Sequence, residues 1–327
     1  QDVWVMTAVS LLNGDRQGAI IMKGIEGETK AYNGTDYTYY GPADCEIVEN
    51  TDGTVDYNFK LREDLKFSDG EPITIDDVIF SMYVLCDPTY DGNSTLFALP
   101  IEGMDAYRSG MDTLYNLMLA AGRDNTDFTN NKWTEEEQTA FWADVDQAGV
   151  KFVQAIMQYC IAEGANAEGD SVAACMANWG FELPADATEA DAFNAIVAKY
   201  PSLAEAVDAE KPEGTTFTSL LNDYETKYTK GIETGTSAAN ISGIKKTGDY
   251  SMTVSLTQVD ATAIYQLGVT IAPMHYYGEK AKYDYDNNKF GFDKGDLSHV
   301  REKTTTPVAA GPYKLRNFEN DILSVDA

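Results

Sequence analysis

The sequence predicts a mixed α/β fold in which a large helical segment interrupts a domain built on β-strands. Two stretches alternate between apolar and polar residues, and the stretch between them is rich in alanine, glutamate and methionine with helical periodicity. Alternation with a period of two places apolar side chains on one face of a half-buried strand, whereas apolar residues three and four apart indicate a helix. With 327 residues, 43% of them apolar, the chain is long enough for about two domains with separate cores.

The first alternating stretch predicts a β-hairpin over residues 46–62. Every second residue of its second strand is apolar: Val55, Tyr57, Phe59 and Leu61. The dipeptide Asp52-Gly53 precedes this strand, and glycine supplies the positive φ that a tight hairpin turn needs.

A polar turn at residues 68–72 leads into a predicted helix that ends near Cys86. Thr74 offers a hydroxyl cap, and Asp76 and Asp77 place negative charge at the start of the helix. An Asp-Pro pair stops the helix. Three apolar residues at helical spacing are expected to be buried: Val78, Met82 and Leu85. The acidic residues of this stretch, Asp69 included, are interpreted as turn and cap residues.

Residues 104–240 are predicted to form a helical insertion. Thr134 and Glu137 make a capping box, and a second helix is capped near Thr188. The first helix carries one apolar stripe: Phe141, Val145, Ala148, Phe152, Ile156 and Tyr159. The second is expected to bury Phe193, Ile196 and Val197. Such stripes usually form a core.

Strands return after the helical segment. Residues 250–256 alternate as cleanly as the first strand, and residues 241–246 are the expected partner across a Gly-Asp turn. Residues 281–306 are predicted to be a polar loop zone, and residues 32–40 a loop between short strands. A last strand is expected over residues 313–318. Residues 1–103 and 241–327 are therefore predicted to build one mixed sheet, since a long insertion costs little closure entropy.

The charge of the chain limits the classes of partner. A net charge of −29 repels phosphate backbones and anionic lipid surfaces, so nucleic acid is not expected as a partner. The acidic residues are dispersed along the sequence, which favours a solvated extracellular surface over an acidic site for a cationic ligand. No apolar run is long enough to span a membrane and no signal peptide opens the chain, so it is either cytosolic or had a targeting segment removed.

The sequence offers little for metal or redox chemistry. Four cysteines lack CxxC spacing and are expected to be free and mostly buried, with a Cys160–Cys175 pair as the alternative. Asp284 and Asp286 begin like a calcium loop, but the glycine and the final glutamate of that motif are missing, which favours a solvated loop over a weak calcium site. No cofactor or metal is expected.

Catalytic motifs are also missing. His275 and His299 are the two histidines of the sequence, so any histidine-based triad passes through one of them. The chain contains neither a G-x-S-x-G elbow nor an H-E-x-x-H motif, and it lacks the glycine-rich loops that bind phosphates. We therefore do not expect an enzyme.

Four motifs, taken in order, resemble a known family. They are the Asp52-Gly53 hairpin, the stretch from Phe59 to Val78, the step Pro273-Met274-His275, and Gly311-Pro312-Tyr313-Lys314-Leu315. This order and spacing resemble the extracellular solute-binding proteins of family 5, which deliver oligopeptides, dipeptides or nickel to ABC importers. The resemblance covers roughly residues 1–103 and 241–327 and leaves the helical segment unmatched.

The resemblance implies part of a two-lobe periplasmic-binding-protein-like fold of type II. Relatives bind their ligand between two lobes that close by a hinge, largely through main-chain hydrogen bonds. In two respects the chain departs from the family. Ala309 stands where relatives have glycine, and the chain ends at Ala327, where relatives cross into the second lobe. The expectation is an N-terminal fragment of the first lobe, with the second lobe following residue 327.

The resemblance places the ligand cleft beside residues 87–97. Tyr90, Asp91 and Phe97 are the candidate ligand-binding residues, and the alternative is a packed turn with a buried aromatic residue. Other ligand contacts of the family belong to the segment after residue 327.

The resulting functional hypothesis is the substrate-binding component of an ABC transporter. It would capture a peptide outside the cytoplasmic membrane as a lipid-anchored monomer and deliver it to the permease, without making or breaking a bond. Nickel chelates and oligosaccharides remain alternative ligands. Two other classes of function stay open: a secreted hydrolase or glycosidase that uses paired carboxylates, and a non-catalytic surface interaction protein.

Overall fold

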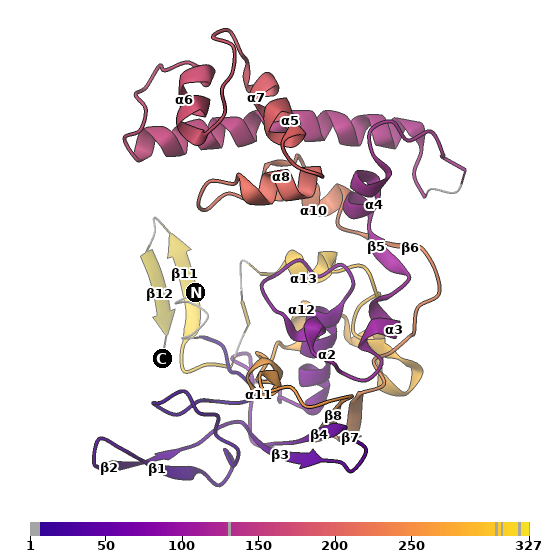
Figure 1. Ribbon diagram of the computed structural model, residues 1–327. Coiled ribbons are helices and arrows are strands. Elements are labelled where there is room, and N and C mark those ends of the chain that lie inside the picture. The colour runs from indigo at the N-terminus through magenta and orange to yellow at the C-terminus, as the bar shows by residue number, and fades with distance from the viewer. Residues whose placement is uncertain (1–6, 130–131, 305–306, 309, 320–321, 327) are drawn as a thin grey trace. The chain divides into compact units, whose positions relative to one another are not determined.

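The computed structural model describes residues 7–129, 132–304, 307–308, 310–319 and 322–326, and its chain forms two compact units (Figure 1). The first unit contains residues 1–112 and 230–327, and the second contains residues 113–229. The helical segment was expected to span residues 104–240. In the structure, α3 (Met104–Arg108) and β6 (Gly231–Glu233) belong to the first unit.

The largest sheet of the first unit has four strands in the order β3-β4-β8-β7. These are β3 (Ala43–Glu49), β4 (Val55–Leu61), β8 (Ser251–Leu256) and β7 (Ile244–Gly248). Both predicted hairpins are confirmed, and Gly53 has the expected positive φ of 90°. The apolar residues of β4 are all buried, whereas Asp56 and Asn58 on its other face are half-buried. The two hairpins are joined edge to edge through β4 and β8.

The expectation of one mixed sheet is wrong for the described residues. All strand pairs whose register is described are antiparallel, and several form small separate sheets. The small sheets pair β1 (Glu28–Tyr32) with β2 (Thr35–Tyr39), β5 (Met111–Thr113) with β6, β9 (Tyr283–Asp284) with β10 (Lys289–Phe290), and β11 (Lys314–Glu319) with β12 (Ile322–Asp326). Consecutive strands that are joined by a tight turn, such as β1 and β2, can pair only in the antiparallel direction, since parallel strands need a long crossover connection.

The segment predicted as a loop at residues 32–40 is the second half of such a hairpin. Asn33 and Gly34 connect β1 to β2 with φ values of 49° and 79°. Positive φ at two successive turn residues is the geometry of a two-residue hairpin turn, for which Asn-Gly is the preferred pair. The tyrosines that suggested a loop therefore lie in strands.

Helix α2 (Ile75–Cys86) forms the centre of the first unit's core. Thr74 is the N-cap, as the sequence predicted, and it forms with Asp77 a capping box that was not identified from the sequence. Val78 and Met82 are fully buried, and the helix packs against β7 and β10. Leu85 was expected to be buried as well but is half-buried, because it faces a pocket instead of the core.

The stretch predicted as a polar loop zone, residues 281–306, contains short elements and part of the core. It holds η2 (Lys280–Lys282), β9, η3 (Tyr285–Asn287), β10 and α13 (Ser298–Arg301). Phe290 is buried and its ring stacks on Tyr83 of α2, with 3.5 Å between the ring centroids. The acidic residues of this stretch occupy turns while the apolar residues between them pack inward, so composition alone gave the wrong result.

The second unit is helical. Its elements are α4 (Leu114–Ala121), α5 (Glu135–Ala162), α6 (Val172–Trp179), α7 (Glu189–Ala198), α8 (Leu203–Ala209), α9 (Phe217–Leu220) and α10 (Tyr224–Lys227). The predicted capping boxes begin α5 at Thr134 and α7 at Thr188. The apolar stripe of α5 is buried except at Tyr159, which is half-buried and packs edge-on against Trp179. Val197 of α7 is half-buried too, because the core side of that helix is formed by Phe193 and Ile196.

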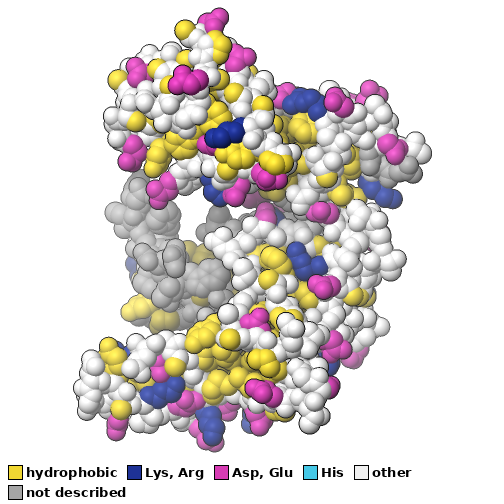
Figure 2. Space-filling view, viewed as in Figure 1, with side chains coloured by type: hydrophobic (Ala, Val, Ile, Leu, Met, Phe, Trp, Pro, Cys, Tyr) yellow, Lys and Arg dark blue, Asp and Glu magenta, His cyan; other side chains and the backbone are white. Residues whose placement is uncertain are grey.

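Three further predictions about the chain can be compared with the structure. All four cysteines are buried and free, so the alternative of a Cys160–Cys175 pair is wrong. Of the helices in the described residues, none combines the length and apolar character needed to cross a membrane. Figure 2 shows acidic side chains scattered over the visible face of both units. Their dispersion is the pattern expected of a solvated acidic surface.

Candidate ligand-binding site

The first unit contains a pocket of about 760 Å³. Its walls come from the last turns of α2, the loop that follows α2, the residues between α11 (Ala263–Leu267) and α12 (Met274–Tyr277), and the segment around α13. The lining residues are Thr7, Ala8, Phe80, Ser81, Val84, Leu85, Tyr90, Asn93, Ser94, Gln266, Val269, Thr270, Ile271, Ala272, Tyr277, Val300, Thr304, Pro307 and Val308. A volume of roughly 300–1,000 Å³ is typical of pockets that hold a small ligand.

Hydrogen bonds from α2 position the far wall of the pocket. The carboxylate of Asp77 caps its own helix through the Thr74 N–H and also accepts the N–H of Met274, at 3.0 Å, which begins α12. One turn later, the Ser81 hydroxyl donates to the Asp77 carbonyl at 2.7 Å and accepts the N–H of Ala272 at 2.8 Å. The residues that cap α2 therefore also hold the segment that carries Ala272 and Tyr277 against the helix.

The loop after α2 is fixed at its start by the buried carboxylate of Asp87. Its Oδ1 accepts the N–H and hydroxyl of Thr89, and its Oδ2 accepts the N–H of Gly295 at 2.9 Å. Arg108 donates to the carbonyls of Cys86 and Asp87, at 2.9 and 2.7 Å, where the helix ends. Two segments far apart in sequence thus meet beside the pocket.

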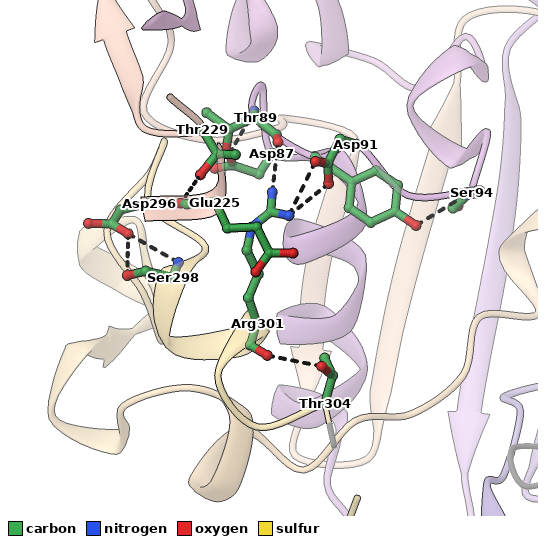
Figure 3. Close-up of polar contacts among 11 residues, drawn as sticks. Asp87, Thr89, Asp91, Ser94, Glu225, Thr229, Asp296, Ser298, Arg301 and Thr304 are labelled. Atoms are coloured by element: carbon green, nitrogen blue, oxygen red, sulfur yellow. Dashed lines mark hydrogen bonds and ion pairs between the residues drawn. The ribbon is translucent and has the colours of Figure 1, made fainter. Parts of the chain in front are cut away.

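Tyr90 is the one sequence-predicted site residue that lines the pocket. Its ring folds back over its own loop, and its hydroxyl accepts the N–H of Ser94 at 3.2 Å. Asp91 is instead paired with Arg301 of α13, with 3.0 Å between Oδ1 and Nη1 (Figure 3). Phe97 packs against the core in η1 (Leu96–Ala98), and the guanidinium of Arg108 lies 4.2 Å from its ring centroid.

Arg301 joins α13 to the loop after α2. Its Nη2 lies 3.4 Å from the carbonyl oxygen of Thr89, and its side chain is 18% exposed. The Nε atom is buried and has no hydrogen-bond partner among the described residues. The neighbouring residues Val300 and Thr304 line the pocket, so this ion pair links two of its walls.

The described residues of the pocket wall carry no charge, which matters for the alternative of a hydrolase. Paired-carboxylate catalysis needs two acids that face each other in a cleft. Burial raises the pKa of both Asp77 and Asp87, yet each carboxylate is engaged by backbone N–H groups and neither lines the pocket. The two buried carboxylates are therefore structural, and the described geometry does not favour this alternative.

The remaining candidate groups are also engaged in structural contacts. His275 Nε2 lies 2.7 Å from Asp69 Oδ2, and His299 Nε2 lies 3.2 Å from the carbonyl oxygen of Gly278. Asp284 caps η3 by accepting hydrogen bonds from Asn287. Within the described part of the chain, no group of three or more His, Cys, Asp or Glu side chains is placed to hold a metal ion.

Gly92 allows Tyr90 to fold over the loop. A Cβ atom at position 92 would lie 2.6 Å from Cζ of Tyr90. We expect Gly92→Ala to push the Tyr90 ring out of place, since the end of a flexible side chain moves more easily than backbone. The free energy of unfolding should change by less than about 1 kcal/mol, while ligand binding at the pocket weakens about as much as in Tyr90→Ala.

Calorimetric titration of both single variants and of the double variant tests this expectation. Because both changes act through the same ring, the double variant should bind no more weakly than Tyr90→Ala alone. Additive losses would show that position 92 affects binding by another route.

The buried carboxylate of Asp77 predicts a pH dependence of stability. Burial raises its pKa, although the N–H groups of Thr74 and Met274 act in the opposite direction. The folded state then holds this proton more tightly than the unfolded state, so the stabilising contribution is full below the unfolded pKa of about 3.9. It is lost as pH rises through the folded pKa. The unfolding free energy of wild type relative to the non-titrating Asp77→Asn should therefore fall from about pH 4 upward.

Asp69 supplies a control of opposite sign. Burial acts to raise the pKa of Asp69, but hydrogen bonds from His275 and the Glu71 N–H outweigh it and lower the pKa. Stability from Asp69 is thus present above the unfolded pKa and lost as pH falls through the folded pKa. In urea unfolding, wild type should lose stability relative to Asp69→Asn as pH falls below about 4, and relative to Asp77→Asn as pH rises above about 4. The same direction of change relative to both variants would contradict the assignment for Asp77.

Most of the pocket wall was not identified from the sequence. Val269 and Ile271 follow the second alternating strand and immediately precede the Pro273-Met274-His275 step, which was the nearest signal. Val300 and Val308 lie in or next to the segment interpreted as a polar loop. Nothing in local periodicity indicates that these residues meet α2.

Comparison with known families gives one match. Residues 41–152 match the family described as "Bacterial extracellular solute-binding proteins, family 5 Middle". The match covers about a third of the chain and includes β3, β4, α2 and the loop with Tyr90. It also continues through α4 into α5, so the expectation that the helical segment is unmatched is wrong for its first part. Neither the curated proteins nor the solved structures yield a match. The family match supports a solute-binding role of the kind that serves ABC importers outside the cytoplasmic membrane.

Proposed function

We propose that this chain is the peptide-capturing part of an ABC importer. Its role is to bind a peptide outside the cytoplasmic membrane and to present it to the permease. The pocket carries this proposal, because one of its walls is built from the family-matched segment and its volume suits a small ligand. The charge-free wall also suits capture and release better than bond breaking.

Tyr90 is proposed as a direct ligand contact. Its aromatic ring lines the pocket, and its hydroxyl is held by the loop, so the ring offers a rigid apolar surface. Asp91 and Phe97 are proposed to act indirectly, by holding the loop to Arg301 and Arg108.

The wider assembly is proposed from the resemblance. In this proposal the first unit is part of one lobe of a two-lobe fold of type II, the second unit is a helical insertion, and a second lobe completes the ligand cleft. A lipid anchor would keep the monomeric protein close to its permease.

Native mass spectrometry tests the proposal. The purified chain is incubated with a mixed peptide pool, and we expect added masses that correspond to bound peptides. Tyr90→Ala should lose these masses, whereas Tyr265→Ala, a tyrosine that is 59% exposed and outside the pocket wall, should keep them. No bound peptide in wild type, or equal loss in both variants, would refute peptide capture at this pocket.

A further inference from the structure

The pocket wall differs from the rest of this acidic protein because none of its described residues is charged. The chain has 53 acidic and 24 basic residues, yet none of the described residues that line the pocket is Asp, Glu, Lys, Arg or His. We propose that the pocket accepts an uncharged, largely apolar ligand group and rejects charged ones. The inference rests on the proposed function, in that it takes this pocket as the ligand site.

Several polar side chains in the wall are bonded to other groups of the protein. Ser81 bonds to Asp77 and Ala272, and the Tyr90 hydroxyl accepts the N–H of Ser94. Gln266 accepts from Thr95 at 2.9 Å and donates to Thr262 at 2.9 Å. The Thr304 hydroxyl donates to the Arg301 carbonyl. With these groups engaged, the wall offers a ligand mainly apolar contact.

The charged side chains that adjoin the pocket are engaged by other groups of the protein. Arg301 is paired with Asp91, and Lys303 donates to the carbonyl of Tyr276. Asp77 and Asp87 are buried behind the wall and bonded to backbone N–H groups. A charged group that entered the pocket would lose water without gaining a counter-ion, and that loss is large for an unpaired charge.

The apolar residues of the wall favour apolar ligand groups over charged ones. Apolar wall residues come from all sides of the pocket: Phe80, Val84 and Leu85 from α2, Val269 and Ile271 before α12, and Val300 and Val308 around α13. Removing apolar ligand surface from water against them is favourable roughly in proportion to the area buried. A ligand that carries aliphatic or aromatic side chains is therefore the class that fits this site.

A matched pair of dyes tests the charge preference directly. N-phenyl-1-naphthylamine is uncharged, and 8-anilino-1-naphthalenesulfonate has the same aromatic body with one sulfonate. Fluorescence titration should show at least about tenfold tighter binding of the uncharged dye. The titration is made at high salt, which screens long-range repulsion by the net charge of −29. Equal affinities at high salt would overturn the inference.

Charge-introducing variants locate the effect. Leu85→Lys, and independently Thr304→Lys at an exposed position of the wall, should shift the affinity ratio toward the sulfonate dye by about tenfold. Ile47→Lys is the control, since Ile47 is 41% exposed on β3 and lies outside the pocket. An equal shift in the control would assign dye binding to another surface and overturn the inference.

Tripeptides separate this inference from the proposed function. With acetylated amino and amidated carboxyl termini, so that only the central side chain differs in charge, Ala-Leu-Ala and Ala-Phe-Ala should bind at least about tenfold more tightly than Ala-Glu-Ala and Ala-Lys-Ala, measured by calorimetry. If a charged tripeptide binds as tightly as Ala-Leu-Ala, peptide capture stands and the charge preference is wrong. If no tripeptide binds while the dyes follow the expected pattern, the charge preference stands and peptide capture is wrong.

Discussion

Replacing Asp87 by alanine is expected to lower the free energy of unfolding of the first unit by about 3 kcal/mol. Asp87 is fully buried and accepts three hydrogen bonds, two from Thr89 and one from Gly295. Each buried donor left without an acceptor costs about 1–3 kcal/mol. Burying the carboxylate is itself unfavourable, as its raised pKa shows, and alanine removes this cost. The three unpaired donors outweigh that relief.

The same substitution should weaken ligand binding at the pocket. Asp87 joins the loop after α2, which carries Tyr90 of the pocket wall, to the segment that leads into α13, which carries Val300 of the wall. Hydrogen exchange of amides in β4 and β8 measures the stability of the first unit. Tryptophan fluorescence is less suitable for this purpose, because the described tryptophans lie in the second unit. The control is Asp36→Ala at an exposed position of β2 outside the pocket wall, where a surface substitution should change the free energy of unfolding by less than about 0.5 kcal/mol and leave ligand binding unchanged. Equal losses for both variants would refute the anchoring role of Asp87.

Local patterns were sufficient for the hairpins and the capped helices. The β3-β4 hairpin follows from alternation plus one turn glycine, and α2 follows from a cap, an apolar stripe and an Asp-Pro stop. The pairing of β4 with β8 does not follow, because alternation identifies the buried face of a strand and not its neighbour. Tyr57 pairs with Val254 although the whole helical unit separates them in the sequence, and that choice is made by packing.

The candidate site was predictable only in part, for a related reason. Resemblance pointed to the loop after α2, but a single sequence does not show which side chains of a loop face a pocket. Tyr90 faces it because Gly92 leaves room for the ring, Asp91 turns to a partner on α13, and Phe97 turns to Arg108. Each outcome depends on a contact that is not visible in local sequence.

The second prediction of large effect concerns the second unit. Gly149→Ala is expected to destabilise that unit by about 2 kcal/mol, although alanine is the better helix former. A Cβ at position 149 would lie 2.6 Å from Cγ of Phe193. The ring has nowhere to move, because it stacks on Phe217 and packs edge-on against Phe152. Overpacking of this kind typically destabilises a protein by about 1–3 kcal/mol, which exceeds the gain of about 1 kcal/mol from the higher helix propensity of alanine.

Urea unfolding followed by tryptophan fluorescence measures this loss, since three of the four tryptophans, Trp133, Trp142 and Trp179, lie in the second unit. Ala143→Gly, at an exposed position of α5, calibrates the propensity difference of about 1 kcal/mol without any clash. A smaller side chain at position 193 should relieve the clash. The double variant Gly149→Ala with Phe193→Leu should therefore lose less free energy of unfolding than the sum of the losses in the two single variants. Ligand binding in the first unit should not change, because the clash is confined to the helical core. A stabilised Gly149→Ala variant would mean that Phe193 repacks freely and that helix propensity decides the outcome.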